Sequence, residues 1–146
     1  MKAVIAFVTY HGNCERAAQT LATLVEADGN QATVVSIRDG RIPDESWDAL
    51  VICAPVHAGS IVRIARRFAL QRAHRDRRFA LVVSHGAPLN HFFSPIRSAD
   101  KTHRRLIRRG MTAVLPPTYL RVAEPKGPFE AGFEEKLVEV RDALFA

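Results

Sequence analysis

Six consecutive apolar residues near the N-terminus, Ala3 to Val8, are followed by a short polar segment and then by a helical pattern. An uninterrupted run rich in Val and Ile is typical of a strand buried on both faces of a parallel sheet. In the polar segment, Gly12 suits an unusual backbone angle and Asn13 suits a helix N-cap. Strand, tight turn and helix in this order can bind phosphate, because the helix N-terminus presents free N–H groups and a positive dipole end.

The rest of the chain alternates between strand and helix patterns. Ile61, Ile64, Ala65 and Phe68 are predicted to form the apolar face of one helix. The loop at 39–43 leaves room for one helical turn at most before Trp47. Further strands are predicted at about 32–37, 49–54, 79–84 and 112–122. In the last of these, Pro116-Pro117 indicates an interruption or an edge position. Further helices are predicted at about 14–27, 95–109 and 133–144.

This alternation predicts an α/β fold in a single domain spanning residues 1–146. Right-handed crossovers would place helices on both faces of a five-stranded parallel sheet, for which we expect the strand order 2-1-3-4-5. In such sheets ligands bind outside the carboxyl ends of the strands, at the switch point between strands one and three.

Three polar loops that contain glycine follow core strands and meet at this expected switch point. One loop alone would be weak evidence, because such turns often need glycine, but three at one sheet edge predict a site. The predicted binding residues are Thr9, Tyr10, His11, Gly12, Asn13 and Cys14 in the first loop, Pro55, Val56, His57, Ala58 and Gly59 in the second, and Ser84, His85, Gly86 and Ala87 in the third.

With these loops the sequence resembles the flavodoxin superfamily, and the resemblance covers nearly the whole chain. Residues 9–15, Thr-Tyr-His-Gly-Asn-Cys-Glu, look like the family's phosphate loop T-x-T-G-x-T-E, and residues 54–59, Ala-Pro-Val-His-Ala-Gly, look like its second flavin loop. The resemblance implies a flavodoxin-like three-layer α/β/α sandwich. Within the superfamily, the second loop and the basic helix after it are most similar to the group containing menaquinone-dependent protoporphyrinogen oxidase.

The resemblance implies that FMN is bound noncovalently. Its phosphate would contact the backbone N–H groups of residues 10–14 and the hydroxyl of Thr9. Its ring would lie between the second and third loops, with Val56, His57 and the segment 91–93 as candidates to flank it. Backbone groups of residues 57–59 and 85–87 would contact the ring edge.

The first loop departs from the family pattern, because His11 and Cys14 replace two hydroxyl residues. A thiol at a helix N-terminus is expected to have a lowered pKa, which would suit a nucleophile. A cysteine phosphatase is disfavoured, however, because the residue six positions after Cys14 is Thr20 and not Arg. We therefore interpret Cys14 as a substitute for Thr, and both cysteines of the chain as reduced thiols.

Other chemistries receive less support from the site loops. Four of the six histidines fall in or near them (His11, His57, His85 and His91), but no H-x-x-x-H or H-x-H spacing supports a metal site. Thr9 and Tyr10 stand where a receiver domain needs paired acids. For Phe92 and Phe93 the default expectation is the core, with a flavin wall or a surface for substrate or lipid as alternatives.

The chain carries a net charge of +6, and its basic residues are concentrated in two segments. Residues 63–78 hold seven arginines against one acid, and residues 97–109 hold six basic residues against one acid. Such segments attract anionic partners, although a solubilising helix face explains any single arginine equally well.

The favoured hypothesis is an FMN-dependent oxidoreductase acting on a small anionic or quinone-type substrate, such as a porphyrinogen with its propionates. The alternative is a noncatalytic module, or an electron carrier, that binds an anionic partner through the arginine-rich helices. Nucleic-acid binding would rest on charge alone and is disfavoured. We expect a cytoplasmic protein, with peripheral membrane association open, and take a homodimer as the default oligomeric state.

Overall fold

The apolar runs of the chain form one parallel sheet in the computed structural model, which describes residues 1–42 and 46–146. The parallel strands are β1 (Lys2–Phe7), β2 (Gln31–Ser36), β3 (Ala49–His57), β5 (Arg78–His85), β6 (Thr112–Ala113) and β7 (Thr118–Arg121), and β4 (Ser60–Ile61) runs antiparallel to β3. The helices are α1 (Asn13–Ala27), α2 (Arg63–Arg72), α3 (Ile96–Arg108) and α4 (Phe133–Leu144), with a 3-10 turn η1 (Ile37–Asp39).

The strand order is β2-β1-β3-β5-β6, with β7 also paired to β5. This confirms the predicted order 2-1-3-4-5, in which β5 is the fourth expected strand. The fifth expected strand is divided into the two short strands β6 and β7. The predicted interruption at Pro116-Pro117 is confirmed, because these residues lie between β6 and β7. Proline has no N–H with which to continue a ladder of hydrogen bonds.

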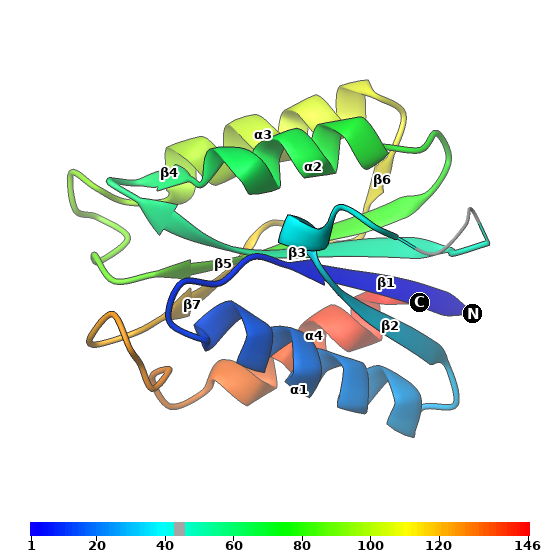
Figure 1. Ribbon diagram of the computed structural model, residues 1–146, viewed down its shortest axis with the longest axis horizontal. Coiled ribbons are helices and arrows are strands. Elements are labelled where there is room, and N and C mark those ends of the chain that lie inside the picture. Colours follow the sequence, from blue (N-terminus) through cyan, green and yellow to red (C-terminus); the bar gives the residue numbers. More distant parts are fainter. Residues whose placement is uncertain (43–45) are drawn as a thin grey trace.

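Helices cover both faces of the sheet, α1 and α4 on one and α2 and α3 on the other (Figure 1). Each face has its own apolar core. On one, Leu21 of α1 and Leu137 of α4 are fully buried. On the other, Phe68 of α2 and Leu106 of α3 are buried against Phe79 of the sheet. Strands enclosed by helices on both sides explain the continuous apolar runs in the sequence.

Two details of the predicted elements are wrong. The segment 55–57, expected to be loop, continues strand β3, which turns back through Ala58 and Gly59 into β4. Ile61 therefore lies in β4 and not on the face of α2, and Ile64 of α2 is 40% exposed. The apolar pattern alone could not separate a two-residue strand from the start of a helix.

The connection between β2 and β3 is short, as expected. Its described part contains η1, and Gly40 follows in a left-handed conformation with φ of 65°. Pro43, at the end of the predicted loop, lies outside the described residues, as does part of the segment in which one helical turn was expected. Within the described residues, no helix has both the length and the apolar character needed to span a bilayer.

Candidate functional site

The carboxyl ends of β1, β3 and β5 enclose a cavity of about 770 Å³. It lies at the switch point, because β1 pairs with β2 on one side and with β3 on the other. Eleven of the fifteen predicted site residues line it: Thr9, Tyr10, His11, Asn13, Cys14, Pro55, Val56, His57, Ser84, His85 and Gly86. The topology therefore brings the three predicted loops to one place.

Four predicted residues support these loops without lining the cavity, namely Gly12, Ala58, Gly59 and Ala87. Ala58 and Gly59 form the β3–β4 turn with φ of 49° and 81°. A Cβ at Gly59 would lie 3.1 Å from the Phe93 carbonyl carbon, so glycine also allows the close approach of residues 93 and 94.

The first loop is shaped by Gly12. Gly12 is the N-cap of α1 with φ of 88°, and its N–H donates to the Thr9 hydroxyl oxygen over 2.8 Å. Asn13 was predicted to be the N-cap, which is wrong: it is the first helical residue, and its side-chain amide donates to the Pro125 carbonyl over 2.8 Å. Asn13 therefore ties the start of α1 to another loop.

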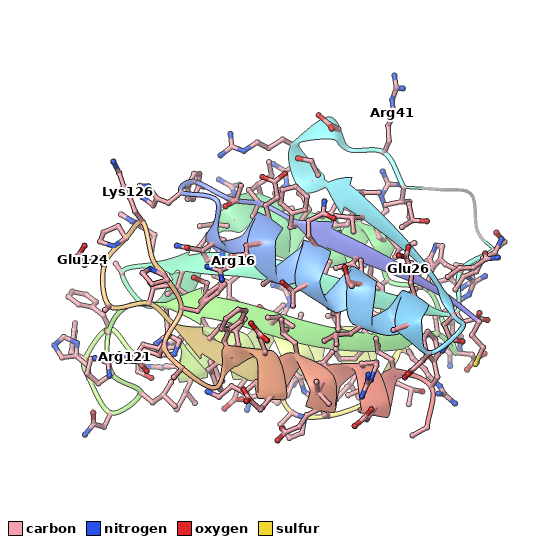
Figure 2. All side chains as sticks on the ribbon, turned by 90° about the horizontal axis from the view of Figure 1, so that it is seen from below. Arg16, Glu26, Arg41, Arg121, Glu124 and Lys126 are labelled. Atoms are coloured by element: carbon pink, nitrogen blue, oxygen red, sulfur yellow. The ribbon has the colours of Figure 1, made fainter. Side chains whose placement is uncertain are left out.

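Residues 122–125 form a fourth wall of the cavity that sequence reasoning missed. They follow β7, so the rule that selected the first three loops applies to them as well. Gly127 lies close to Asn13, whose side chain ties α1 to this loop. A Cβ at Gly127 would lie only 2.5 Å from the Asn13 side-chain oxygen. The loop carrying Glu124 and Lys126 projects at the end of the molecule where α1 begins (Figure 2).

Arg63 and Arg66, both on the first turns of α2, also line the cavity and were not predicted to do so. The Arg66 Nε atom is shielded from solvent and has no hydrogen-bond partner among the described residues. The first turn of α2 contains no acid, although acids are favoured there by the helix dipole. Arginines without an acid at the start of this helix were the signal in the sequence for these two lining residues. The excess of positive charge makes this wall suited to an anion.

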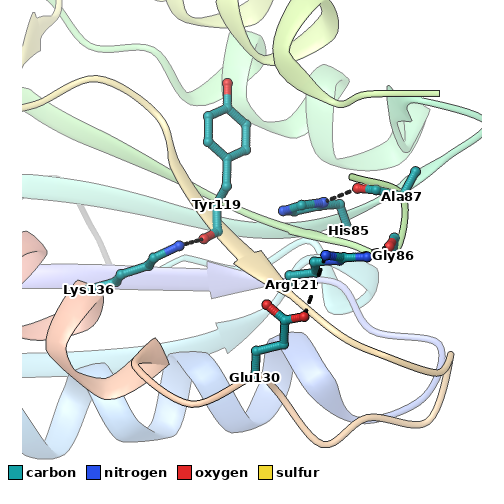
Figure 3. A network of polar contacts seen from close by, with 7 residues as sticks. All are labelled: His85, Gly86, Ala87, Tyr119, Arg121, Glu130 and Lys136. Carbon is teal, nitrogen blue, oxygen red and sulfur yellow. Dashed lines mark hydrogen bonds and ion pairs between the residues drawn. The ribbon is translucent and has the colours of Figure 1, made fainter. Parts of the chain in front are cut away.

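The third loop is held by contacts from β7 and α4 (Figure 3). Arg121 donates from Nε to the Gly86 carbonyl over 3.3 Å and pairs with Glu130 at 3.6 Å. Lys136 donates to the Tyr119 carbonyl over 2.8 Å, and the Tyr119 ring meets the His85 ring edge-on with 6.0 Å between centroids.

His85 is 4% exposed, and its Nδ1 lies 2.7 Å from the Ala87 carbonyl oxygen. A carbonyl can only accept, so Nδ1 carries the proton and Nε2 is an acceptor in the neutral ring. Burial lowers the pKa of His85 from 6.5, and the charges of Lys136 and Arg121 also lower it, against the raising effect of the Ala87 hydrogen bond. His85 is therefore a neutral wall of the site at physiological pH.

Cys14 points into the core, and the prediction of a lowered pKa is wrong. The residue is 3% exposed. Burial raises the pKa of the Cys14 thiol to about 12, against the lowering effect of hydrogen bonds from Ser84. Burial also raises the pKa of the Cys53 thiol, and both thiols are free. Desolvation of the thiolate thus outweighs the helix dipole, and Cys14 is not an activated nucleophile.

The segment 91–93 does not line the cavity, so its flanking of a bound ring stays a prediction. The default expectation that Phe92 and Phe93 belong to the core is wrong, since they are 90% and 45% exposed. The described residues bring together no group of three His, Cys, Asp or Glu side chains that could hold a metal ion.

Solved structures similar to this chain include several flavodoxins. Oxidised flavodoxin 1 from Bacillus cereus has a TM-score of 0.79 at 18% identity, with 99% of this chain and 97% of that chain covered. A flavodoxin from the domain Archaea has a TM-score of 0.75 at 15% identity over 100% of both chains. The chain has a flavodoxin-like fold.

A larger protein contains the same fold as one part. Rubredoxin oxygen:oxidoreductase from Desulfovibrio gigas has a TM-score of 0.74 at 14% identity, covering 98% of this chain but 35% of that chain. No protein-family model and no curated protein sequence matches the chain. These results do not support the narrower resemblance to the protoporphyrinogen oxidase group.

Thiol reactivity tests the placement of the two cysteines. We expect neither Cys14 nor Cys53 to react with a thiol reagent such as DTNB at pH 8 in the folded protein, because both are buried and protonated. Two thiols should react after unfolding in guanidinium. Thr23→Cys, at an exposed position of α1, is the control and should react at once. Rapid reaction of one thiol in the folded wild-type protein would contradict the burial of Cys14.

Proposed function

We propose that the cavity binds FMN noncovalently and that the protein is an FMN-dependent redox protein. The observation that carries this proposal is the first loop, where a hydroxyl, a left-handed glycine and a helix N-terminus converge on one end of the cavity. When bound, FMN supplies hydride and electron transfer. The flavodoxin-like fold supports the choice of cofactor.

The donors at the first loop fit a phosphate group. The first helical hydrogen bond of α1 runs from the Arg16 N–H to the Gly12 carbonyl, so the N–H groups of residues 13–15 have no acceptor within the helix. The Thr9 oxygen accepts from the Gly12 N–H, which leaves the hydroxyl hydrogen to donate to a ligand. Exposed His11 stands in the same loop and would add positive charge in its protonated form.

The volume and walls of the cavity fit the remainder of the cofactor. A volume of about 770 Å³ lies in the range of pockets for ligands of this size. Tyr10, Val56 and His57 offer flat or apolar surfaces to a ring. The loops that follow β5 and β7 also line the cavity, and hydrogen bonds hold both of them in place. The site is therefore largely formed before the ligand binds.

Comparison of FMN with riboflavin tests the phosphate contacts directly. Thr9→Val should weaken FMN binding by about tenfold or more, the effect of losing a hydrogen bond to a charged group, and should leave riboflavin binding within twofold. Quenching of flavin fluorescence measures both affinities. Thr20→Val, the same substitution later in α1, is the control and should change neither.

Two results would overturn the proposal. One is that the wild-type protein quenches neither flavin at micromolar concentrations. The other is that Thr9→Val weakens FMN and riboflavin equally, because the residue would then support the cavity without contacting a phosphate.

For the redox partner we propose an anionic substrate, with a porphyrinogen as the specific candidate and a quinone as acceptor. Arg63 and Arg66 support this proposal, because they line the cavity at the start of α2, whereas the phosphate loop lies at the start of α1. The guanidinium group of Arg66, which lines the cavity, is suited to a carboxylate, such as a propionate of a porphyrinogen.

Kinetics of variants test the role of Arg66. Arg66→Gln should raise KM for protoporphyrinogen about tenfold, because a charge-assisted hydrogen bond is lost, and should leave KM for a neutral quinone unchanged. Arg67→Gln is the control, since Arg67 is an exposed neighbour that does not line the cavity. Equal effects of the two substitutions, or a wild-type protein that does not oxidise the porphyrinogen, would contradict this assignment of the substrate.

A further inference from the structure

The loop at residues 86–95, here called the aromatic loop, exposes apolar side chains that folding would normally bury. Phe92 is 90% exposed, Phe93 45% and Leu89 42%. Ile96, at the start of α3, is 38% exposed and extends the same surface. Exposed aromatic and aliphatic groups gathered in this way mark interaction sites on soluble domains.

The aromatic loop has a defined shape. The Ser94 N–H donates to the His91 carbonyl over 2.9 Å, and the His91 N–H donates to the Pro88 carbonyl over 3.0 Å. The Phe93 N–H donates to His91 Nδ1 over 3.1 Å, and the Phe92 and Phe93 rings meet edge-on with 5.1 Å between centroids. The hydrogen bonds fix the turn that presents Phe92, so the ring is held outward before any partner binds.

Basic side chains border the apolar surface. Leu89, Phe92 and Ile96 line one shallow hollow together with Arg97 and Arg104 of α3, and one acid, Asp100, also lies there. Arginines surrounding exposed phenylalanine give the surface an apolar tip and a cationic rim.

The basic residues of the whole chain are concentrated in the segment that contains the aromatic loop. Residues 63–109, which include α2 and α3, hold thirteen of the 21 basic residues and two of the 15 acidic residues, a net charge of +11. The remainder of the chain carries a net charge of −5. In the ranges 1–42 and 46–146, none of those thirteen basic residues forms an ion pair with an Asp or Glu side chain. Nine of these thirteen basic residues lie on α2 and α3, which cover one face of the sheet (Figure 1), and we call this layer the basic face.

We propose that the protein docks on anionic lipid bilayers, with Phe92 and its apolar neighbours inserted at the interface and Arg97 and Arg104 against the headgroups. Aromatic rings favour the boundary between headgroups and acyl chains, and basic side chains favour the anionic surface above it. A nucleic-acid duplex would engage the charge but would offer no apolar layer to Phe92 and Leu89. This docking surface is separate from the proposed FMN contacts, and the inference holds with or without the cofactor.

The docked orientation would bring the cavity close to the bilayer. Residues 93 and 94 pack against Gly59 in the turn that follows the second loop, so the aromatic loop adjoins the site. A lipid-soluble molecule could then reach the cavity from the membrane side.

Vesicle binding of the full chain tests the proposal. The protein should sediment with vesicles of phosphatidylcholine and phosphatidylglycerol (3:1) at 0.1 M NaCl and at least tenfold less with pure phosphatidylcholine. Phe92→Ser should lower the partition coefficient about tenfold, because the ring no longer leaves water. Ile107→Ser, which removes a 46% exposed apolar group outside the aromatic loop, should change it less than twofold.

A charge-matched pair of variants separates docking from general attraction. Arg97→Gln with Arg104→Gln should lower the partition coefficient about 25-fold, at roughly fivefold for each charge near the surface. Lys2→Gln with Arg41→Gln removes the same charge elsewhere and should lower it less than threefold. Arg41 projects into solvent away from the loop that carries Lys126 (Figure 2).

Insertion of the loop has its own spectroscopic signal. In Phe92→Trp the new indole should shift its emission to the blue on anionic vesicles and be quenched by brominated lipid, while Trp47 is 4% exposed and contributes a constant background. Absence of vesicle binding at 0.1 M NaCl would overturn the proposal, even if the protein bound duplex DNA or an acidic protein. Equal losses in the two charge-matched pairs, or unchanged binding of Phe92→Ser, would overturn it too.

Discussion

Parallel pairing of β1 with both β2 and β3 is the constraint on which the rest of the molecule depends. The chain leaves β1 in one direction to form α1 and β2, and returns on the other side of β1 to form β3. The crossovers therefore leave the sheet on opposite faces, and the loops after β1 and β3 separate at their carboxyl ends. The cavity occupies that separation, with the start of α1 on one side and the start of α2 on the other.

The two helix starts have different chemical character. At α1, Gly12 and Thr9 arrange neutral donors, and the nearest thiol is withdrawn into the core. At α2, charged donors dominate, because Arg63 and Arg66 line the wall. A ligand with a phosphate at one end would meet the first, and an anionic substrate would meet the second. Beyond the cavity, the basic face continues the positive surface to Arg97 and Arg104, which border the apolar aromatic loop at the proposed membrane contact.

Sequence patterns were sufficient for the fold and for most of the site. The run from Ala3 to Val8 and its counterparts require strands covered on both faces, and their order along the chain leaves few arrangements. The three glycine-containing loops then follow from the topology. The loop at 122–125 was missed because it contains no glycine and follows a strand that Pro116-Pro117 interrupts, although the same topological rule applied to it.

The remaining differences concern the directions and environments of side chains. Neither the burial of the Cys14 thiol nor the outward position of Phe92 can be read from local pattern, because each depends on contacts between segments distant in sequence. The Ser84 contact of Cys14 and the packing of residues 93 and 94 on Gly59 are examples. Helix dipole arguments gave the wrong sign for the shift in the pKa of Cys14 because desolvation, which needs the folded core, is the larger effect.

The visible absorption spectrum of the protein shows whether the cavity at the switch point holds FMN. The purified protein would be measured as isolated, and again after incubation with FMN and removal of free flavin by desalting. We predict that flavin absorption bands remain with the protein at close to one FMN per chain. A protein that stays colourless after both treatments would contradict the account of the site, whatever the result of the vesicle experiments.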